Sequence, residues 1–317
     1  MPLVYIIIVN WNGLADTVEC LESLRSIDYS NYRVVVVDNA SSDNTVEVIK
    51  LKYPDVFLII NSENLGFARA NNRAISFALS HKADFIFLLN NDTIVKPDIV
   101  SRLLQAHSVL TNPGLLGCKI YYYDEPETIQ YCGGILEYFP ELKGYHGEEG
   151  CIDDGGYDDI TVTDFVTGCA MFGSRQLWEN IEGFDENFFM YWEDSELSLR
   201  VRNMGSFNYV IPSAILYHKV GSSTGRRDHP LNWFYWSRNR IYFAKKHNIP
   251  FPAFRFALCR LRTVLGMKWP LRYTGALSES LAYLYGALTI MGRAPRFLER
   301  SHDSFLEARV RKKFGKT

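Results

Sequence analysis

Short apolar runs alternate with helical patterns over the first 110 residues of the chain. The apolar runs cover residues 3–9, 33–37, 56–60 and 85–89. A helical pattern follows each run, ending at residue 26, beginning after 43, and covering about 68–79 and 97–110. Strands that are apolar throughout and alternate with helices are buried on both faces. They predict an α/β fold with a Rossmann-like, doubly wound, mostly parallel sheet.

Beyond residue 110 the pattern changes. Residues 118–173 have no regular pattern and include an acidic loop, which we interpret as solvated, with a metal site as the alternative. Its carboxylates are Asp153, Asp154, Asp158 and Asp159. Helical patterns return over 194–203 and 231–247, and the remainder predicts two or three amphipathic helices. We therefore expect a catalytic domain of residues 1–225 and a basic helical C-terminal region of residues 226–317.

The net charge of −2 hides a strong asymmetry along the 317 residues. Residues 226–317 contain 19 Lys and Arg against 5 Asp and Glu, a net charge of +14, whereas the preceding residues contain 15 basic and 31 acidic side chains. Such a basic region predicts contact with phospholipid headgroups, a polyprenyl diphosphate or nucleic acid. Because no nucleic-acid recognition module accompanies it, we expect no nucleic-acid partner. Two interpretations of these basic residues are open. They can contact a membrane surface, or their long side chains can simply cover a core while the charged groups stay in water.

The cysteine pattern and the apolar segments predict a cytoplasmic protein. The six cysteines include no CxxC pair and no metal-ligand spacing with histidine, which indicates reduced thiols. No basic residue precedes the apolar run 3–9, which indicates a first strand rather than a signal peptide. The apolar stretch 281–291 is shorter than the roughly 20 residues that span a bilayer. We expect a cytoplasmic location, with peripheral contact at the inner membrane face as the open alternative.

Polar side chains follow the first two predicted strands where those strands end. Asn10 and Asn12 follow the first strand, and Asp38 and Asn39 follow the second. Parallel sheets bind ligands beyond the carboxyl ends of their strands, and a carboxylate at a strand tip, such as Asp38, can accept hydrogen bonds from a nucleoside. For Ser42 and Asp43, capping of the next helix and ligand contact are equally consistent interpretations.

The third strand is followed by NSENLGFARANN at residues 61–72. Gly66 allows close backbone approach, and the N-terminus of the following helix favours phosphate. The segment contains neither GxGxxG nor a GK[ST] phosphate loop. Its sequence therefore argues against a nicotinamide dehydrogenase and against a phosphate-loop NTPase.

The fourth strand runs directly into Asn90, Asn91, Asp92 and Thr93. A nucleoside diphosphate is commonly held through Mg²⁺ or Mn²⁺ by one or two carboxylates, with phosphate oxygens and water as further ligands. Asp92 fits that role, and a helix cap before residue 97 is the alternative. His218 ends a strand-like run and precedes a Gly/Ser loop, where it can be a metal ligand, a diphosphate contact or a structural residue.

Two adjacent carboxylates, Glu193 and Asp194, follow an aromatic run and open a predicted helix. The helix dipole alone also favours acidic residues at this position. The neighbouring Tyr191 and Trp192 would partly desolvate a carboxylate and raise its basicity toward that of a general base. The pair is therefore a candidate for catalysis.

Taken together, seven strings resemble the family 2 glycosyltransferases of the GT-A fold, especially their rhamnosyltransferase-like branch. The strings are IIIVNWNG, VVVVDNASSDN, NLGFARANN, LLNNDT, FVTGCAMF, GFDENFFMYWEDSELSLR and YHKVGSS. They occur in the family's order, between about residues 4 and 247. The resemblance implies a GT-A fold with a C-terminal helical extension.

The resemblance also implies roles for individual residues. Those implied around the nucleotide are Asn10, Asn12, Asp38, Asn39, Asn64, Gly66, Phe67, Asn71 and Asn91. Asp92 would end a DXD-like metal motif, and His218 would approach the metal or the diphosphate. Asp194 would be the catalytic base, with Glu193 as its neighbour. The chain departs from the family at the metal motif, where Asn90-Asn91-Asp92 has one carboxylate and many relatives have two.

The implied enzyme is an inverting, metal-dependent hexosyltransferase that uses Mg²⁺ or Mn²⁺. We expect transfer of a sugar, with L-rhamnose from dTDP-L-rhamnose as the leading candidate, to a hydroxyl of a saccharide or lipid-linked saccharide in cell-surface polysaccharide synthesis. Asp194 would remove the acceptor proton while metal on Asp92 stabilises the departing nucleoside diphosphate. The alternative is a noncatalytic nucleotide- or saccharide-binding module with the same fold. The Glu193-Asp194 pair argues against a noncatalytic module, whereas the single carboxylate of the metal motif, Asp92, argues for one.

Overall fold

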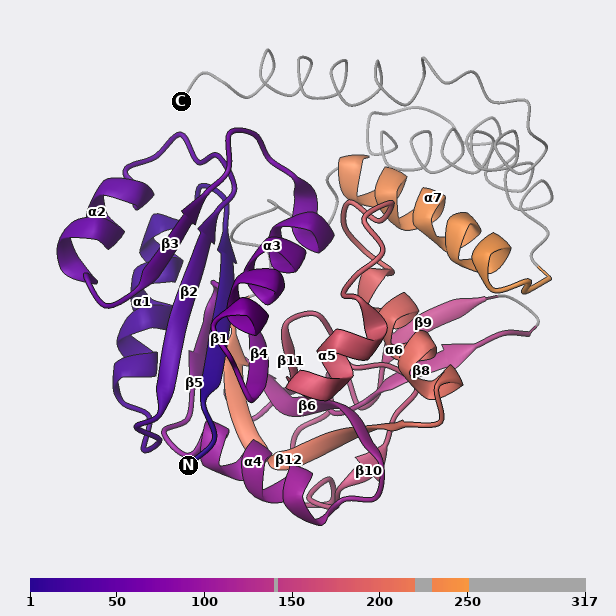
Figure 1. Ribbon diagram of the computed structural model, residues 1–317. Coiled ribbons are helices and arrows are strands. Elements are labelled where there is room, and N and C mark those ends of the chain that lie inside the picture. Colours follow the sequence, from indigo (N-terminus) through magenta and orange to yellow (C-terminus); the bar gives the residue numbers. More distant parts are fainter. Residues whose placement is uncertain (140–141, 220–229, 251–317) are drawn as a thin grey trace, which may run out of the picture. The chain divides into compact units, whose positions relative to one another are not determined.

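The structure is a computed structural model that describes residues 1–139, 142–219 and 230–250 (Figure 1). The chain divides into two units, Met1–Gly225 and Arg226–Thr317. The described part of the second unit is helix α7 (Pro230–Lys246) with the short segment to residue 250. The helices expected beyond that residue lie outside the described residues. None of the helices in the three described ranges combines the length and the apolar character that a bilayer crossing requires.

The first unit contains one large sheet, one small sheet and several helices. The helices are α1 (Leu14–Arg25), α2 (Thr45–Lys52), α3 (Gly66–Ser80), α4 (Ile99–Val109), α5 (Arg175–Ile181) and α6 (Glu193–Asn203). The large sheet comprises β1 (Val4–Asn10), β2 (Tyr32–Asp38), β3 (Phe57–Ile60), β4 (Phe85–Asn90), β5 (Thr93–Val95), β6 (Pro113–Tyr122), β7 (Ile129–Tyr131), β10 (Thr161–Val162), β11 (Ala170–Ser174) and β12 (Phe207–His218). The small sheet pairs β8 (Gly134–Glu137) with β9 (Lys143–His146).

Strands β3, β2, β1 and β4 are parallel neighbours in that order, as the apolar runs predict. The chain moves outward from β1 to β2 and β3, then returns to place β4 on the other side of β1. The register sets Asn10 beside Asp38 and Val9 beside Asn90, so the carboxyl ends of the three strands coincide. A reversal of strand order of this kind is where open α/β sheets bind ligands.

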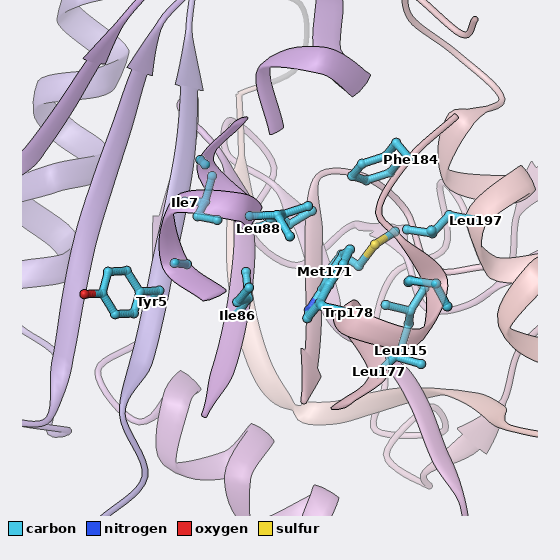
Figure 2. Close-up of a cluster of buried hydrophobic side chains, with 14 of the residues drawn as sticks. Tyr5, Ile7, Ile86, Leu88, Leu115, Met171, Leu177, Trp178, Phe184 and Leu197 are labelled. Carbon is cyan, nitrogen blue, oxygen red and sulfur yellow. The ribbon is translucent and has the colours of Figure 1, made fainter. Parts of the chain in front are cut away.

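A buried apolar cluster holds the helices against this sheet (Figure 2). Ile7 of β1 and Leu88 of β4 belong to it, together with Met171 of β11 and Trp178 of α5. Leu197 of α6 is also a member and is fully buried. Each fully buried aliphatic or aromatic side chain contributes about 1.5–3 kcal/mol. The cluster therefore fixes the helix that begins with the candidate catalytic carboxylates.

The interpretation of residues 118–173 as irregular is wrong. This segment provides half of β6, most of β11 and all of β7 to β10. Strand β11 lies antiparallel between β4 and β6, and β12 runs parallel to β6. Strands β7 to β10 contain 3, 4, 4 and 2 residues. Such strands are too short for alternation of apolar and polar residues to reveal them.

The acidic loop is only partly solvated. The Lys119 ammonium of β6 contacts Asp153 Oδ2 and Asp158 Oδ1, each at 2.7 Å, and the Lys119 side chain is 1% exposed. Tyr121 also donates its hydroxyl hydrogen to Asp153. Burial raises the pKa of Asp153, but the hydrogen bonds from Lys119 and Tyr121 lower it to about 2 overall. The expectation of a solvated loop is thus wrong for Asp153, because that carboxylate neutralises a buried lysine.

Candidate active site

Asn10 is fully buried at the end of β1, and both ends of its side-chain amide are hydrogen-bonded. Its Nδ2 donates to Asp38 Oδ1 at 3.1 Å and to Ser41 Oγ at 3.0 Å. Its Oδ1 accepts hydrogen bonds from Asn91 Nδ2 at 3.1 Å and from Thr17 Oγ1 at 2.9 Å. One amide therefore connects the tips of β1 and β2 to the residue that follows β4.

The loops after β1 and β2 are also joined to each other. Asn12 has a left-handed backbone with φ of 54°, and its Oδ1 accepts a hydrogen bond from the Ser42 amide at 2.7 Å. Asp43 accepts hydrogen bonds from Thr45, at the start of α2, and from the backbone amide of Leu14, at the start of α1. Capping therefore accounts for the contacts of Asp43.

Asn39 extends this network to the segment after β3. Its Nδ2 donates to Asn64 Oδ1 at 2.8 Å, and its Oδ1 accepts from Asn61 Nδ2 and the Leu65 amide, each at 2.9 Å. Asn64 Oδ1 also accepts a hydrogen bond from the Gly66 amide at 2.9 Å. The Asn side chains of the predicted nucleotide site thus bond to one another and fix the backbone at the sheet edge.

The start of α3 touches the aromatic segment that precedes α6. Gly66 has φ of 77°, and a Cβ atom there would lie 2.6 Å from the Phe189 carbonyl oxygen. The Phe67 amide donates to the same oxygen at 2.8 Å. A Cβ atom on Gly168 would lie 3.1 Å from Phe67 Cζ, so this ring reaches the segment before β11. Asn71 is buried and donates to the Phe67 carbonyl at 3.0 Å, inside the helix.

Asp92 and His218 meet at the carboxyl edge of the sheet. The antiparallel pairing of β5 with β12 sets Thr93 opposite His218. His218 Nε2 lies 3.0 Å from Asp92 Oδ1, and the two side chains are 12% and 7% exposed. Burial lowers the pKa of His218, but the neighbouring Cys169 and Asp92 raise it to about 10 overall. Since Gln130 Oε1 lies 2.9 Å from Nδ1, both ring nitrogens of His218 face acceptors and the ring is protonated.

This pair suits a divalent metal whose other ligands come from the substrate. The described residues contain no group of three or more His, Cys, Asp or Glu side chains that could hold a metal. One carboxylate and one imidazole are sufficient when diphosphate oxygens and water complete the coordination. Gln130 bonds to Nδ1 and thereby orients Nε2 toward Asp92, as outer partners of metal-binding histidines do. Metal binding would require His218 to lose the proton on Nε2.

Two aromatic residues with unusual backbone conformations place the carboxylates of α6. Tyr191 has φ of 68° and Trp192 has φ of 71°. Non-glycine residues in strained conformations cost about 1–3 kcal/mol each and persist where the surroundings fix them. Trp192 is buried, which holds the turn that begins α6. This turn delivers Glu193 and Asp194 side by side at the helix N-terminus.

Asp194 is held by backbone donors on both carboxylate oxygens. Its Oδ2 accepts from the Gly168 amide at 3.1 Å, and its Oδ1 accepts from the Ser195 amide at 2.6 Å. Cys169 follows Gly168 in the chain, and its carbonyl oxygen accepts a hydrogen bond from the Asn90 amide at 2.9 Å. Cys169 also lies close enough to His218 to raise the pKa of that ring. Gly168 therefore contacts Asp194, and the adjacent Cys169 lies beside His218 of the Asp92-His218 pair.

Glu193 is a buried carboxyl group beside Asp194. It is 6% exposed, and its Oε2 has no hydrogen-bond partner within the described part of the chain. Burial, and then the charge of Asp194, raise its pKa well above the usual 4.5. We infer that Glu193 keeps its proton to a higher pH than an exposed glutamate does.

Replacing Glu193 with Gln should stabilise the protein at pH 7, because the buried carboxyl must take up a proton on folding whereas the amide need not. In the wild type, the Glu193 carboxyl ionises above pH 4.5 in the unfolded chain, whereas in the folded chain its pKa is raised. The free energy of unfolding therefore falls as the pH rises from 4.5 through the raised folded pKa. Thermal unfolding of both proteins between pH 4.5 and 8 measures the difference. The advantage of the variant should shrink toward pH 4.5, and a difference independent of pH would contradict a protonated Glu193.

Two residues close to these groups were not predicted from the sequence. Gln130 lies on β7 and His146 ends β9. His146 Nδ1 lies 3.2 Å from the Gln130 carbonyl oxygen, and the pKa of His146 responds to both Asp194 and His218. Their strands are short and carry no chemical motif, so only the strand pairing reveals their position.

Comparisons with known proteins place the chain in a sequence family. The sequence model of the family described as "Glycosyl transferase family 2" matches residues 5–179. The N-acetylglucosaminyl-diphospho-decaprenol L-rhamnosyltransferase of Mycobacterium tuberculosis (strain ATCC 25618 / H37Rv) is 28% identical over 215 residues, covering 61% of this chain and 68% of that protein. The dTDP-rhamnosyl transferase RfbF of Shigella flexneri is 22% identical over 262 residues, covering 78% and 81%.

A solved structure supports the fold. The mannosyltransferase PcManGT of Pyrobaculum calidifontis, in complex with GDP-Man and Mn²⁺, aligns with a TM-score of 0.55 at 16% identity. The alignment covers 98% of this chain and 80% of that one. The expected GT-A type of α/β fold is thereby confirmed.

Proposed function

The chain belongs to glycosyl transferase family 2 and is a glycosyltransferase, and we propose that it moves L-rhamnose from dTDP-L-rhamnose to a hydroxyl of a lipid-linked saccharide, with inversion at the anomeric carbon. The names of the Mycobacterium and Shigella relatives support this donor and an acceptor of this kind. The observation that carries the proposal is the position of the adjacent residues Gly168 and Cys169, of which the first contacts Asp194 and the second lies beside His218 of the Asp92-His218 pair.

In the proposed reaction, Asp194 is the general base. It takes the proton of the acceptor hydroxyl as the hydroxyl oxygen forms its bond to the anomeric carbon, and the bond from that carbon to the diphosphate breaks. The amides of Gly168 and Ser195 fix the orientation of the carboxylate. Direct displacement by the acceptor inverts the configuration and needs no covalent intermediate.

Asp92 and His218 would hold Mg²⁺ or Mn²⁺. Bound metal would neutralise charge on the departing nucleoside diphosphate. The residues proposed around the nucleotide are Asn10, Asn12, Asp38, Asn39, Asn64, Gly66, Phe67, Asn71 and Asn91. Asp38 is the carboxylate among them and lies at the tip of β2, where it can accept hydrogen bonds from the nucleoside. The amides of Asn10, Asn39 and Asn64 hold the surrounding backbone in place.

The basic region of residues 226–317 is proposed to contact the membrane that carries the lipid-linked acceptor, in a protein of the cytoplasm. Its net charge of +14 suits anionic headgroups or an acceptor diphosphate. Flotation with anionic liposomes at low salt tests this contact, and a protein that stays in the soluble fraction would contradict it.

The donor is tested by incubating the purified protein with a panel of nucleotide sugars and an N-acetylglucosaminyl-diphospho-polyprenol acceptor, with Mn²⁺ or with a chelator. We expect release of dTDP from dTDP-L-rhamnose, only with the divalent cation, and a product of opposite anomeric configuration by NMR. Turnover of another donor would replace rhamnose in the proposal. Failure to turn over any donor would instead favour a noncatalytic binding module.

A further inference from the structure

His146, the last residue of β9, has one ring nitrogen engaged and one available. Nδ1 lies 3.2 Å from the Gln130 carbonyl oxygen. A carbonyl oxygen can only accept, so Nδ1 carries the hydrogen in this contact. The ring packs edge-on against Tyr131, with 5.1 Å between the centroids. In the neutral ring, Nε2 is therefore a hydrogen-bond acceptor with a fixed direction.

The surroundings of His146 keep that acceptor available. Burial lowers the pKa of His146, although the charges of Glu149 and Asp194 oppose the effect, and this favours the neutral ring. Across residues 1–139, 142–219 and 230–250, no group is hydrogen-bonded to Nε2, and this atom is not among the fully buried unsatisfied atoms. It can therefore meet a ligand or water.

The position of the ring relates it to both ends of the proposed reaction. Asp194, the proposed base, raises the pKa of His146, and His218, of the proposed metal pair, lowers it. The His146 ring therefore lies near both residues. Gln130 reinforces this link, since its carbonyl bonds to His146 while its side-chain oxygen lies 2.9 Å from His218 Nδ1. In a direct displacement, the transferred sugar lies between the base, which holds the acceptor, and the metal, which holds the diphosphate.

We propose that His146 Nε2 accepts a hydrogen bond from a hydroxyl of the sugar that is transferred, which makes His146 a determinant of donor specificity. This inference rests on the proposed function and adds a residue that contacts the sugar rather than the nucleotide. Packing alone does not require an imidazole here, because an aromatic ring would fill the same space against Tyr131. A histidine with a fixed tautomer adds an acceptor in a partly desolvated site, where an unmade hydrogen bond is costly.

The test compares His146→Phe with His146→Gln, which restores an acceptor near the position of Nε2. With dTDP-L-rhamnose, His146→Phe should lower kcat/KM about 10- to 100-fold, whereas His146→Gln should recover much of the loss. The Kd of dTDP, measured by calorimetry, should stay unchanged in both variants because dTDP lacks the sugar. Tyr145→Phe is the matched control. Tyr145 is a half-exposed neighbour on β9, and its hydroxyl donates to Glu137. The kcat/KM of Tyr145→Phe should equal that of the wild type.

Donors that lack one sugar hydroxyl identify the partner. For one of the 2-, 3- or 4-deoxy analogues of dTDP-L-rhamnose, the wild type should discriminate against the analogue about 10- to 100-fold, and His146→Phe should lose that discrimination. If the wild type turns over dTDP-L-rhamnose but His146→Phe still discriminates against all three analogues, the proposed role of His146 is overturned. The proposed donor is not affected by that result. A wild type that neither binds nor turns over dTDP-L-rhamnose would overturn the proposed donor and this inference together. Loss of dTDP binding in His146→Phe would assign the residue to the nucleotide site instead.

Discussion

Replacing Asp194 with Asn should lower the rate of sugar transfer about 10²- to 10⁴-fold, the usual contribution of a general base. The amide keeps the shape of the carboxylate but cannot take the acceptor proton. Donor binding should change little, because Asp194 is bonded to Gly168 and Ser195 and not to the residues proposed to hold the nucleotide. Single-turnover transfer and calorimetric binding of dTDP-L-rhamnose measure the two properties separately.

The control for this variant is Asp164→Asn. Asp164 forms an ion pair with Arg202 at 2.6 Å on a partly exposed surface, and its other carboxylate oxygen accepts a hydrogen bond from the Leu136 amide at 2.9 Å. Its loss should leave transfer near the wild-type rate, since exposed pairs contribute about 0–1 kcal/mol. If Asp194→Asn also transferred sugar at a near-normal rate, another group would have to be the base.

Replacing Asp92 with Asn should lower kcat/KM about 100-fold or more and weaken the effect of Mn²⁺ on dTDP binding. The expected size follows from the several kcal/mol that a metal contributes to stabilising charge in a transition state. The substitution removes the carboxylate proposed to hold the metal but preserves the shape of the side chain. Titration of activity against Mn²⁺ should show a higher metal requirement, and calorimetry with dTDP should show a smaller difference between Mn²⁺ and chelator.

A second measurement tests the Asp92-His218 pair without activity. The Asp92 carboxylate helps to raise the pKa of His218, so Asp92→Asn should lower that pKa in the metal-free protein, as followed by NMR. Asp98→Asn provides a control, because Asp98 pairs with Arg102 on the surface of α4. Equal responses to Mn²⁺ in the wild type and in Asp92→Asn would contradict the proposed metal site.

The parallel half of the fold could be predicted because its strands are apolar throughout and each is followed by a helix. The same pattern placed Asn10 and Asp38 at the ends of the first two strands, and the structure joins them by a direct hydrogen bond. Burial on both faces leaves a strong signal in the sequence. Parallel pairing then fixes which strand ends coincide.

The other half of the sheet could not be predicted in this way. Strands β7 and β10 of the large sheet and β8 and β9 of the small sheet are short, and only their pairing shows where they lie. Gln130 and His146 reach the candidate site only because β7 pairs with β6 and β9 pairs with β8. Asp153 looked like one of several loop carboxylates, and only its contact with Lys119 sets it apart. Local patterns do not encode such contacts.

The close approach of Gly66 to Phe189 has a consequence for altering this enzyme. At that point two main chains touch, with the Phe189 oxygen accepting the Phe67 amide and leaving no room for a Cβ atom on Gly66. Trimming side chains therefore cannot create space there for a bulkier donor. A variant that accepts larger sugars would have to gain volume elsewhere or carry a redesigned loop, so directed evolution by single substitutions should find few solutions at this contact.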